Sequence, residues 1–483
     1  MSRGSTITPY LICLVFITTL GPLQFGYHLA ELNAPQAVLT CQQKSITSTS
    51  PSSGFPQCIP MSTSQFSLVS STYTLGGLLG ALLAGPISTK YGRLVTLRWT
   101  TFFFLLGSIA ESLASSILVM SIGRLLSGVG AGASIVVGPI YISEIAPTNS
   151  RGFFGTFTQV MTNVGILITQ TLGYFLSKGS SWRLILAIAA GIASLELLSL
   201  AFVVESPVWL AEHQQPSQAR QVLQRIRGND ADIEAEVKLW RVAFSSENVA
   251  VEEESLVSPP SGNVPLRNPP VTILGALLNA KYRPAIIAVI IVMLAQQFTG
   301  INSIIMYSVS LLQNTLSTGA PLLAVIISAL NLVVTLACSP LPDKIGRKTC
   351  LLLSITGMGL SSILLALGIS VGEKTLSAAS SLLFVACFAV GLGPVPFILA
   401  SELVGPEAVG ATQSWALAAN WIATFLVAQF FPMLNDMLGG GKVYWLFAAS
   451  AGIFGVFIFW RVPETKGKAT VEEVWGRQER RRD

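Results

Sequence analysis

Neutral amides occur inside apolar stretches of this chain, and the segment from Gln296 to Asn302 carries three of them. An amide supplies both a hydrogen-bond donor and an acceptor, which suits a small ligand with many hydroxyl groups. Gln297 and Asn302 are five residues apart, so they converge only if the helix bends or breaks, and Gly300 between them permits this. The alternative is that such amides only tie neighbouring helices together by hydrogen bonds.

Ionisable residues also occur inside apolar stretches. His28 and Glu31 lie one turn apart near the end of the first apolar segment, and Arg124 lies within the fourth. Ionisable groups in such segments are functional candidates by default, and His titrates near neutral pH. Arg124 could pair with a carboxylate near His28.

Composition indicates the elements that position these residues. The 483-residue chain is 51% hydrophobic and 11% charged, with a net charge of +5, whereas soluble proteins carry about 25% charged residues. Much of the surface must therefore face lipid, and nucleic acid is not an expected partner. Twelve segments approach the roughly 20 apolar residues of a membrane span: 8–30, 64–85, 94–116, 118–141, 154–177, 182–204, 284–310, 320–341, 349–370, 377–401, 410–432 and 442–461.

The spans fall into two similar sets of six. We expect an N-terminal half at 1–204, a linker with short helices at 205–281, a C-terminal half at 282–468 and a tail at 469–483. Related polar signals recur at matching places: 85–93 and 339–348, Glu144 and Glu402, Glu205 and Glu464. Such duplication is typical of carriers whose site lies where the halves meet near the midplane. The sequence thus predicts an all-α membrane protein of twelve transmembrane helices.

The distribution of basic residues predicts the orientation. With the N-terminus inside, few of the 29 Lys and Arg residues fall outside: Lys44, Lys178, Arg183, Lys374 and Lys442. Basic residues are enriched in cytosolic loops, which places both termini and the linker in the cytosol. The first apolar run, from Ile7, is expected to be a retained span rather than a signal peptide. The host membrane is the plasma membrane or an endomembrane such as the vacuole.

The ordered motifs resemble those of the sugar porter family of the major facilitator superfamily, close to facilitative glucose transporters and fungal hexose transporters. The resemblance extends from Gln24-Phe-Gly-Tyr to Pro463-Glu-Thr-Lys-Gly467. It includes Gly123-Arg124, Tyr141-Ile-Ser-Glu-Ile-Ala-Pro147, Gln296-Gln-Phe-Thr-Gly-Ile-Asn302 and Asn420-Trp421. It implies the major facilitator fold and transport of a monosaccharide, with a hexose as the expected substrate, by a protein that functions as a monomer in a lipid bilayer.

The resemblance also implies roles for individual residues. The sugar-contacting set would be Gln170, Gln296, Gln297, Asn302, Asn331, Asn420, Trp421 and Phe397. Phe397 stands where the family commonly has Trp, which removes an N–H donor, and Ala389 and Val390 stand where a Glu is frequent. These departures bear on the substrate range.

A second implied set comprises charges at helix ends that close the cytosolic side of the outward-open state: Arg93, Glu144, Arg151, Glu205, Asp343, Arg347, Glu402 and Glu464. The second half departs from the pattern, because Val409 stands where Arg151 stands in the first half, with Glu407 nearby. The alternative is solvated helix-end charges of little energetic weight.

Related proton symporters carry an Asp at the position of His28, so facilitated diffusion is the favoured mechanism here. Proton coupling through His28 or Glu31, transport of a polyol, and a receptor that binds sugar without transporting it remain alternatives. An enzyme is not expected, because the chain has no G-x-x-x-x-G-K-[ST] loop and only two histidines. No cofactor or metal is expected.

The cysteines fall into two groups. Cys13, Cys338, Cys350 and Cys387 lie in or beside apolar runs and are expected to be packing residues. Cys41 and Cys58 lie in a polar segment between the first two spans. They could form a disulfide if that segment faces an oxidising compartment, although spacing alone cannot show that the sulfur atoms meet.

Overall fold

The computed structural model describes residues 7–42, 56–147, 150–228, 231–234, 236–238, 273–316, 319–439, 441–468 and 471–476. The ordered elements within these ranges are helices. Lys44 and the linker stretch 252–270 lie outside the described residues.

Twelve spans form the body of the protein. The first six are α1 (Pro9–Ala30), α3 (Thr63–Tyr91), α4 (Arg93–Ser112), α5 (Ile117–Ile145), α6 (Arg151–Leu176) and α7 (Trp182–Ser199). The last six are α12 (Arg283–Phe298) with α13 (Ile301–Leu316), α14 (Ala320–Cys338), α16 (Arg347–Val371), α17 (Lys374–Val390) with α18 (Val395–Glu402), α19 (Val409–Leu438) and α20 (Val443–Arg461).

Eleven of these spans are long and apolar enough to cross a membrane by length and composition. The twelfth span, α6, is 26 residues long, which is enough to cross a membrane. Its hydropathy is reduced by Gln159, Asn163 and Gln170, which lie on a helix that packs against α1 and α14 rather than facing lipid all round. The twelve-span prediction therefore stands, with α6 as the polar member.

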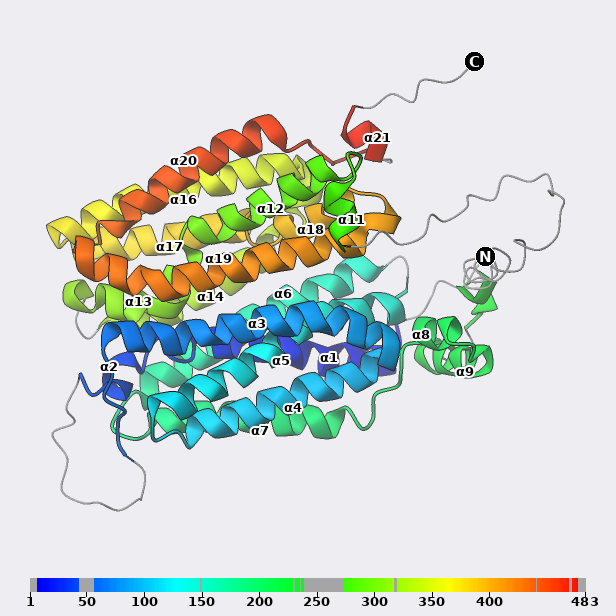
Figure 1. Ribbon diagram of the computed structural model, residues 1–483, viewed down its shortest axis with the longest axis horizontal. Helices are drawn as coiled ribbons and strands as arrows, with labels where there is room; N and C mark the ends of the chain where they lie inside the picture. The colour runs from blue at the N-terminus through cyan, green and yellow to red at the C-terminus, as the bar shows by residue number, and fades with distance from the viewer. Residues whose placement is uncertain are drawn as a thin grey trace.

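The two sets of six spans form two layers (Figure 1). They meet chiefly where α3 packs on α19 and α6 packs on α14. The short helices α8 (Pro207–Glu212), α9 (Pro216–Arg227), α11 (Ile273–Leu278) and α21 (Val471–Val474) gather at one end, which we call the linker end. The short helix α2 (Gln36–Leu39) marks the opposite end, the α2 end. Helix α9 forms where apolar periodicity over 217–227 predicts a helix.

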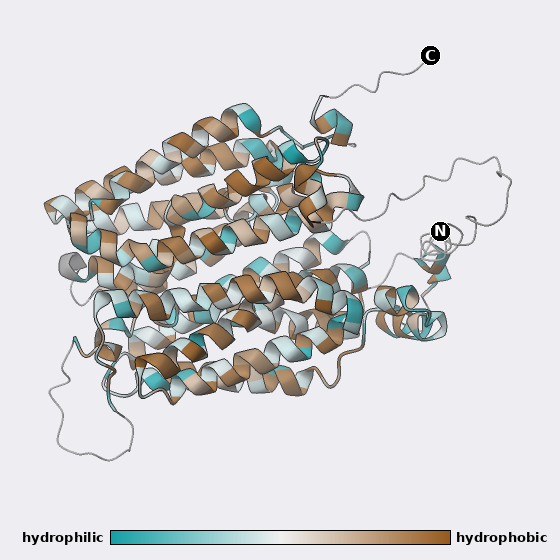
Figure 2. Ribbon diagram, viewed as in Figure 1, coloured by the Kyte–Doolittle hydropathy of each residue, from teal (hydrophilic) through white to brown (hydrophobic). Residues whose placement is uncertain are grey.

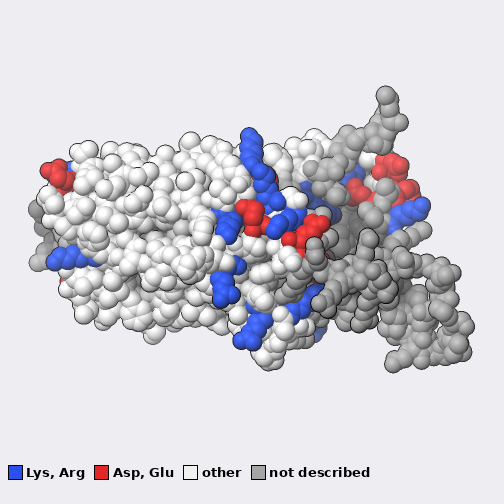
Figure 3. Space-filling model, turned by 90° about the horizontal axis from the view of Figure 1, so that it is seen from above, with Lys and Arg blue, Asp and Glu red and all other residues white. Residues whose placement is uncertain are grey.

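The surface has the pattern of a protein in lipid. Large apolar side chains such as Phe202, Trp460 and Ile453 are at least 70% exposed, and apolar residues dominate the long helices in Figure 2. On the face shown in Figure 3, Lys, Arg, Asp and Glu leave a broad band without charge. Lipid tails offer nothing to solvate a charge, so this band fits the hydrocarbon layer.

Two spans that the hydropathy predicts as continuous, 284–310 and 377–401, are each two helices. The first breaks at Thr299 and Gly300, where Gly300 has a φ of +98°, a conformation that favours glycine. The second breaks between Val390 and Val395, where Pro394 has no N–H to donate and two glycines precede it. Hydropathy cannot reveal such breaks, because the broken segments remain apolar. Each break exposes backbone carbonyls inside the protein.

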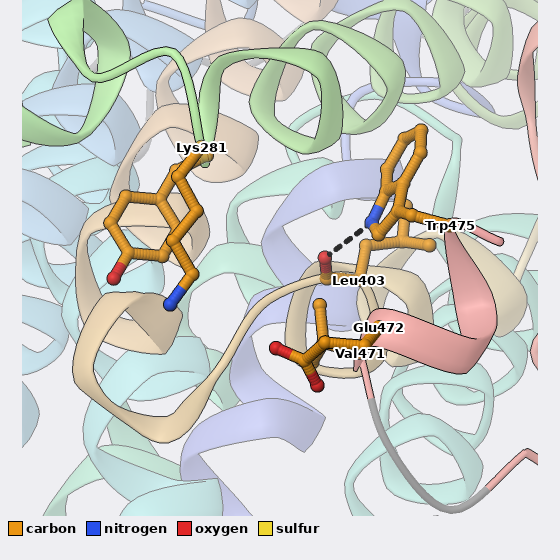
Figure 4. Close-up of a pocket in the computed structure, with 6 residues that line it drawn as sticks. Lys281, Leu403, Val471, Glu472 and Trp475 are labelled. Carbon is orange, nitrogen blue, oxygen red and sulfur yellow. Dashed lines mark hydrogen bonds between the residues drawn. The ribbon is translucent and has the colours of Figure 1, made fainter. Parts of the chain in front are cut away.

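The C-terminal helix α21 folds back onto the linker end of the second half. The indole Nε1 of Trp475 donates to the carbonyl of Leu403 at 3.1 Å, beside a small pocket that Lys281, Val471 and Glu472 also line (Figure 4). This contact ties the tail to the end of α18.

Candidate solute-binding site

Four of the predicted amides form one connected cluster in the second half. Gln297 donates to Gln296 Oε1 at 3.2 Å, and Asn302 donates to Gln297 Oε1 at 2.6 Å. Asn420, on α19, also donates to Gln296 Oε1. The break at Gly300 allows Gln297 and Asn302 to converge although they are five residues apart. The structure therefore brings together the four amides at the helix break.

Gln296 also has a structural task. Its Nε2 donates to the carbonyls of Leu392 at 2.5 Å and Gly393 at 3.2 Å, which the break between α17 and α18 leaves without helical partners. The donor of Gln296 is thus committed to the protein. The amides of Gln297, Asn302 and Asn420 have more hydrogen-bonding capacity than these contacts use.

Further amides from both halves lie at the boundary between the halves. Gln170 on α6 donates to the carbonyl of Ile305 at 3.3 Å, while its buried Oε1 has no partner. Asn331 on α14 donates to Asn163 Oδ1 at 3.3 Å, and Asn163 donates to Thr335 at 2.9 Å. Sequence reasoning missed Asn163, although its position two turns before Gln170 puts both amides on one face of α6.

Trp421 is the aromatic residue that joins the halves at this level. It is 2% exposed, and its ring packs edge-on against Phe25 and Tyr73 of the first half, with centroid distances of 5.8 and 6.2 Å. Its buried Nε1 has no hydrogen-bond partner. Phe397, on α18, is 41% exposed.

At the linker end, the predicted gate residues form ion pairs inside each half. Arg93, the first residue of α4, pairs with Glu144 through Nε and NH2 at 2.7–3.2 Å. Glu205 accepts hydrogen bonds from the backbone N–H groups of Arg93 and Ser206 at 2.9 and 2.8 Å. Burial raises the pKa of the Glu205 carboxyl, and these N–H groups oppose the rise.

The second half repeats this arrangement. Arg347, the first residue of α16, pairs with Glu402 at 2.9 and 3.1 Å, and Glu464 accepts the backbone N–H of Arg347 at 2.8 Å. Asp343 adds a further ion pair to Arg347 at 2.8 Å. The duplicated motifs thus build the same arrangement in each half, which we call a corner. In it, an Arg at the start of a helix pairs with one Glu, and its backbone N–H donates to a second Glu.

Two residues at this end behave differently from the pattern. Arg151 begins α6 and is exposed, and it forms no ion pair with any other residue that the structure describes. Glu407 accepts a hydrogen bond from the Tyr282 hydroxyl at 2.7 Å and lies 3.5 Å from Lys281. The Tyr282 hydrogen bond lowers the pKa of Glu407, and Lys281 adds to the effect. Glu407 therefore anchors the start of α12.

A charge cluster is fully buried inside the first half. Arg124 NH1 lies 2.5 Å from Glu31 and donates to the carbonyl of His28 at 2.8 Å. His28 Nδ1 lies 3.0 Å from the Glu31 carboxylate. Glu111 on α4 completes the cluster and accepts a hydrogen bond from Ser127 at 2.7 Å. Sequence reasoning missed Glu111, although an acidic residue inside the apolar run 94–116 is itself a signal.

This cluster contains residue types that can bind a metal. Ligand atoms of His28, Glu31 and Glu111 lie within 4.8 Å of one another. The guanidinium of Arg124 already neutralises Glu31 at 2.5 Å and would repel a cation. The residues therefore fit an ion-pair network better than a metal site.

A separate buried acid, Glu196 on α7, accepts a hydrogen bond from Gln24 at 2.5 Å.

At the α2 end, Cys41 and Cys58 are joined by a disulfide. Of the free cysteines, Cys350 is buried and Cys13 is exposed, so the predicted packing role fits Cys350 and does not describe Cys13.

Comparison with known proteins places the chain among transporters. The family model described as "Sugar (and other) transporter" matches residues 14–475. The probable metabolite transport protein YBR241C of Saccharomyces cerevisiae (strain ATCC 204508 / S288c) is 35% identical over 97% of this chain and 96% of its own length. Solute carrier family 2, facilitated glucose transporter member 3 of Ovis aries is 30% identical over 98% of this chain and 93% of its own length.

A solved structure with a similar fold is the inward-open xylose transporter XylE from E. coli. It has a TM-score of 0.76 and 25% identity, over 97% of this chain and 99% of that one. These relatives are transporters and not enzymes, as the sequence predicts. From its sequence, its twelve-helix architecture and its relatives, we conclude that this chain belongs to the sugar (and other) transporter family.

Proposed function

We propose that the protein carries a monosaccharide, a hexose, across its membrane by alternating access and without a proton gradient. The observation that carries this proposal is the amide cluster of Gln297 and Asn302 at the α12–α13 break, with Asn420 beside it. Such neutral groups can exchange hydrogen bonds with sugar hydroxyls without binding an ion.

The contacts between the halves support an orientation for this site. Asn33 bonds to Ser308 at 3.0 Å, and Ser71 bonds to Gln429 at 2.7 Å, both on the α2 side of the amide cluster. The linker end is cytosolic in our orientation, so these bonds close the outer side. We therefore infer an inward-facing state, in keeping with the similarity to an inward-open transporter.

The gate belongs to the same proposal. Arg93–Glu144 and Arg347–Glu402 each fix one corner of one half at the cytosolic end. In the outward-facing state, the two corners would approach and become the inner closure. In the inward-facing state, each pair keeps its own half rigid while the halves separate there.

The test is uptake into proteoliposomes that contain the purified protein. A panel of labelled hexoses, pentoses and polyols is supplied without a proton gradient. We expect saturable uptake of a hexose that other hexoses inhibit. Preference for a polyol would redefine the substrate, and binding without uptake of any compound would favour the receptor alternative.

The buried charge cluster favours a second candidate, proton-coupled sugar transport. Glu31 and Glu111 lie close together, Arg124 pairs with Glu31, and Glu111 Oε2 is buried without a hydrogen-bond partner. Two adjacent carboxylates cannot easily both be charged in such a site, so one proton can reside there. If its release depended on which side the site faces, proton and sugar movement would be linked.

An imposed inward proton gradient distinguishes the two candidates. Under facilitated diffusion, the internal sugar concentration only reaches the external one. Accumulation above it that collapses with an uncoupler would establish symport, and loss of that accumulation in Glu111→Gln would assign the proton to the cluster.

A further inference from the structure

A polar pocket lies between the two halves at the α2 end, away from the amide cluster. Its volume is about 150 Å³. The first half lines it with Gln36 of α2, with Gln42 and with Thr63 at the start of α3. The second half contributes residues of α13 and α19, including Ser310 and Asn435. Both halves must therefore be in their present positions for the pocket to exist in this form.

The polar lining has unused hydrogen-bonding capacity. The side-chain oxygens of Gln36 and Asn435 are both buried without a hydrogen-bond partner, and Gln36 is 7% exposed. A buried acceptor without a donor is unfavourable, so native structures rarely leave one unsatisfied. Asp436 adds a carboxylate acceptor to the same lining. A ligand with several hydroxyl groups would supply donors to these unpaired acceptors.

Two aromatic residues also line the pocket. The rings of Tyr307 and Phe431 lie stacked with their centroids 5.7 Å apart. They are 2% and 3% exposed, so they offer a ligand only a small apolar contact beside the polar groups. A cavity of about 150 Å³ holds a six-membered ring such as benzene. A pyranose is larger by its hydroxyl groups, and these would extend outward toward exposed residues such as Ser310.

The pocket is separated from the central amides. Asn33 accepts the N–H of Val309 at 3.1 Å and donates to Ser308 at 3.0 Å, which closes the turn after α1 against α13. These contacts lie between Asn302 and Ser310 along α13. Because the helix rises about 1.5 Å per residue, Asn302 and Ser310 are about 12 Å apart along its axis. One sugar molecule cannot use both places at once.

We propose that this pocket is an outer binding site for a monosaccharide, occupied from the α2 side while the central site faces the cytosol. The chemical class of the ligand rests on the proposed function. The disulfide between Cys41 and Cys58 adjoins Gln42 and fixes the segment that carries Gln36 and Gln42 on the pocket. The outer site would hold incoming sugar beside the closed gate.

The experiment measures protection of a single reporter thiol. Ser310→Cys is reconstituted, and labelling by a membrane-impermeant maleimide from the α2 side is followed with increasing D-glucose or with the hexose that the uptake panel identifies. At ten times the dissociation constant, labelling should slow about tenfold, because only the unoccupied fraction reacts. Lys374→Cys, exposed at the same end and away from the pocket lining, is the control, and its rate should not change.

Two further variants locate the bound sugar. Protection of Ser310→Cys should persist when Gln297→Ala is added, because that change disables the central site only. It should be lost with Asn435→Ala, which removes one of the unpaired acceptors of the pocket. Loss of protection with Gln297→Ala would mean that the central site causes it and would overturn the inference.

The outcomes separate this inference from the proposed function. Saturable hexose uptake without protection of Ser310→Cys would overturn the outer site and leave the proposed function intact. Protection without uptake of any sugar would support the outer site and contradict transport. Neither uptake nor protection would overturn both.

Discussion

Gln297 is the residue on which the central site depends most directly. It accepts a hydrogen bond from Asn302 at 2.6 Å and donates one to Gln296 at 3.2 Å. Gln297→Ala removes the amide that joins these two residues and that faces the sugar in the proposed site. An unpaired polar partner in a desolvated site costs about 1–3 kcal/mol. Since 1.4 kcal/mol is a factor of ten, hexose uptake well below saturation should fall about 5- to 140-fold.

The assay is the initial rate of labelled hexose uptake, corrected for the amount of folded protein by size-exclusion chromatography. Gln297→Asn keeps an amide one methylene shorter and should give an intermediate rate. Gln224→Ala is the matched control, because that amide lies on the linker helix α9 and bonds to the carbonyls of Gly228 and Ala231. If Gln297→Ala transported as well as Gln224→Ala, the assignment of the central site would be wrong.

Three other changes test separate parts of the proposal. Arg93→Ala or Arg347→Ala should shift the inward/outward distribution by about 1 kcal/mol or less each, because the pairs lie near water; an unchanged distribution in distance measurements would contradict the gate. Cys41 and Cys58 should react with an impermeant maleimide only after a reductant is added, and labelling of both without it would reject the disulfide in the native membrane. Glu31→Gln should leave equilibrative uptake without a requirement for a proton gradient, and uncoupler-sensitive accumulation by the unaltered protein would refute facilitated diffusion.

The sequence by itself determined the number of spans and their grouping, because each span is a continuous segment whose hydropathy is a local property. The repeated turns at 85–93 and 339–348 also predicted two equivalent corners, and the structure builds both around Arg93 and Arg347. The fold, the family and the exclusion of an enzyme followed from such local and ordered signals.

The break near Gly300 could be anticipated, because a residue without a side chain lay between two amides of the same motif. The break at Gly391–Pro394 is not predicted, because hydropathy gives 377–401 as one continuous span, and the carbonyls that it exposes to Gln296 are not foreseen either. The sequence likewise predicts no role for Asn163 or Glu111, because each is a single polar residue in an apolar run.

Only the tertiary structure decided which polar groups meet. Gln296 and Asn420 are 124 residues apart, and Asn163 and Thr335 are 172 apart. Whether such residues face each other depends on how each helix is rotated about its axis and which helix lies beside it. An apolar helix in lipid can bury almost any of its faces, so local periodicity does not fix that rotation. It is fixed by close packing between many spans at once, and that information lies in no single segment.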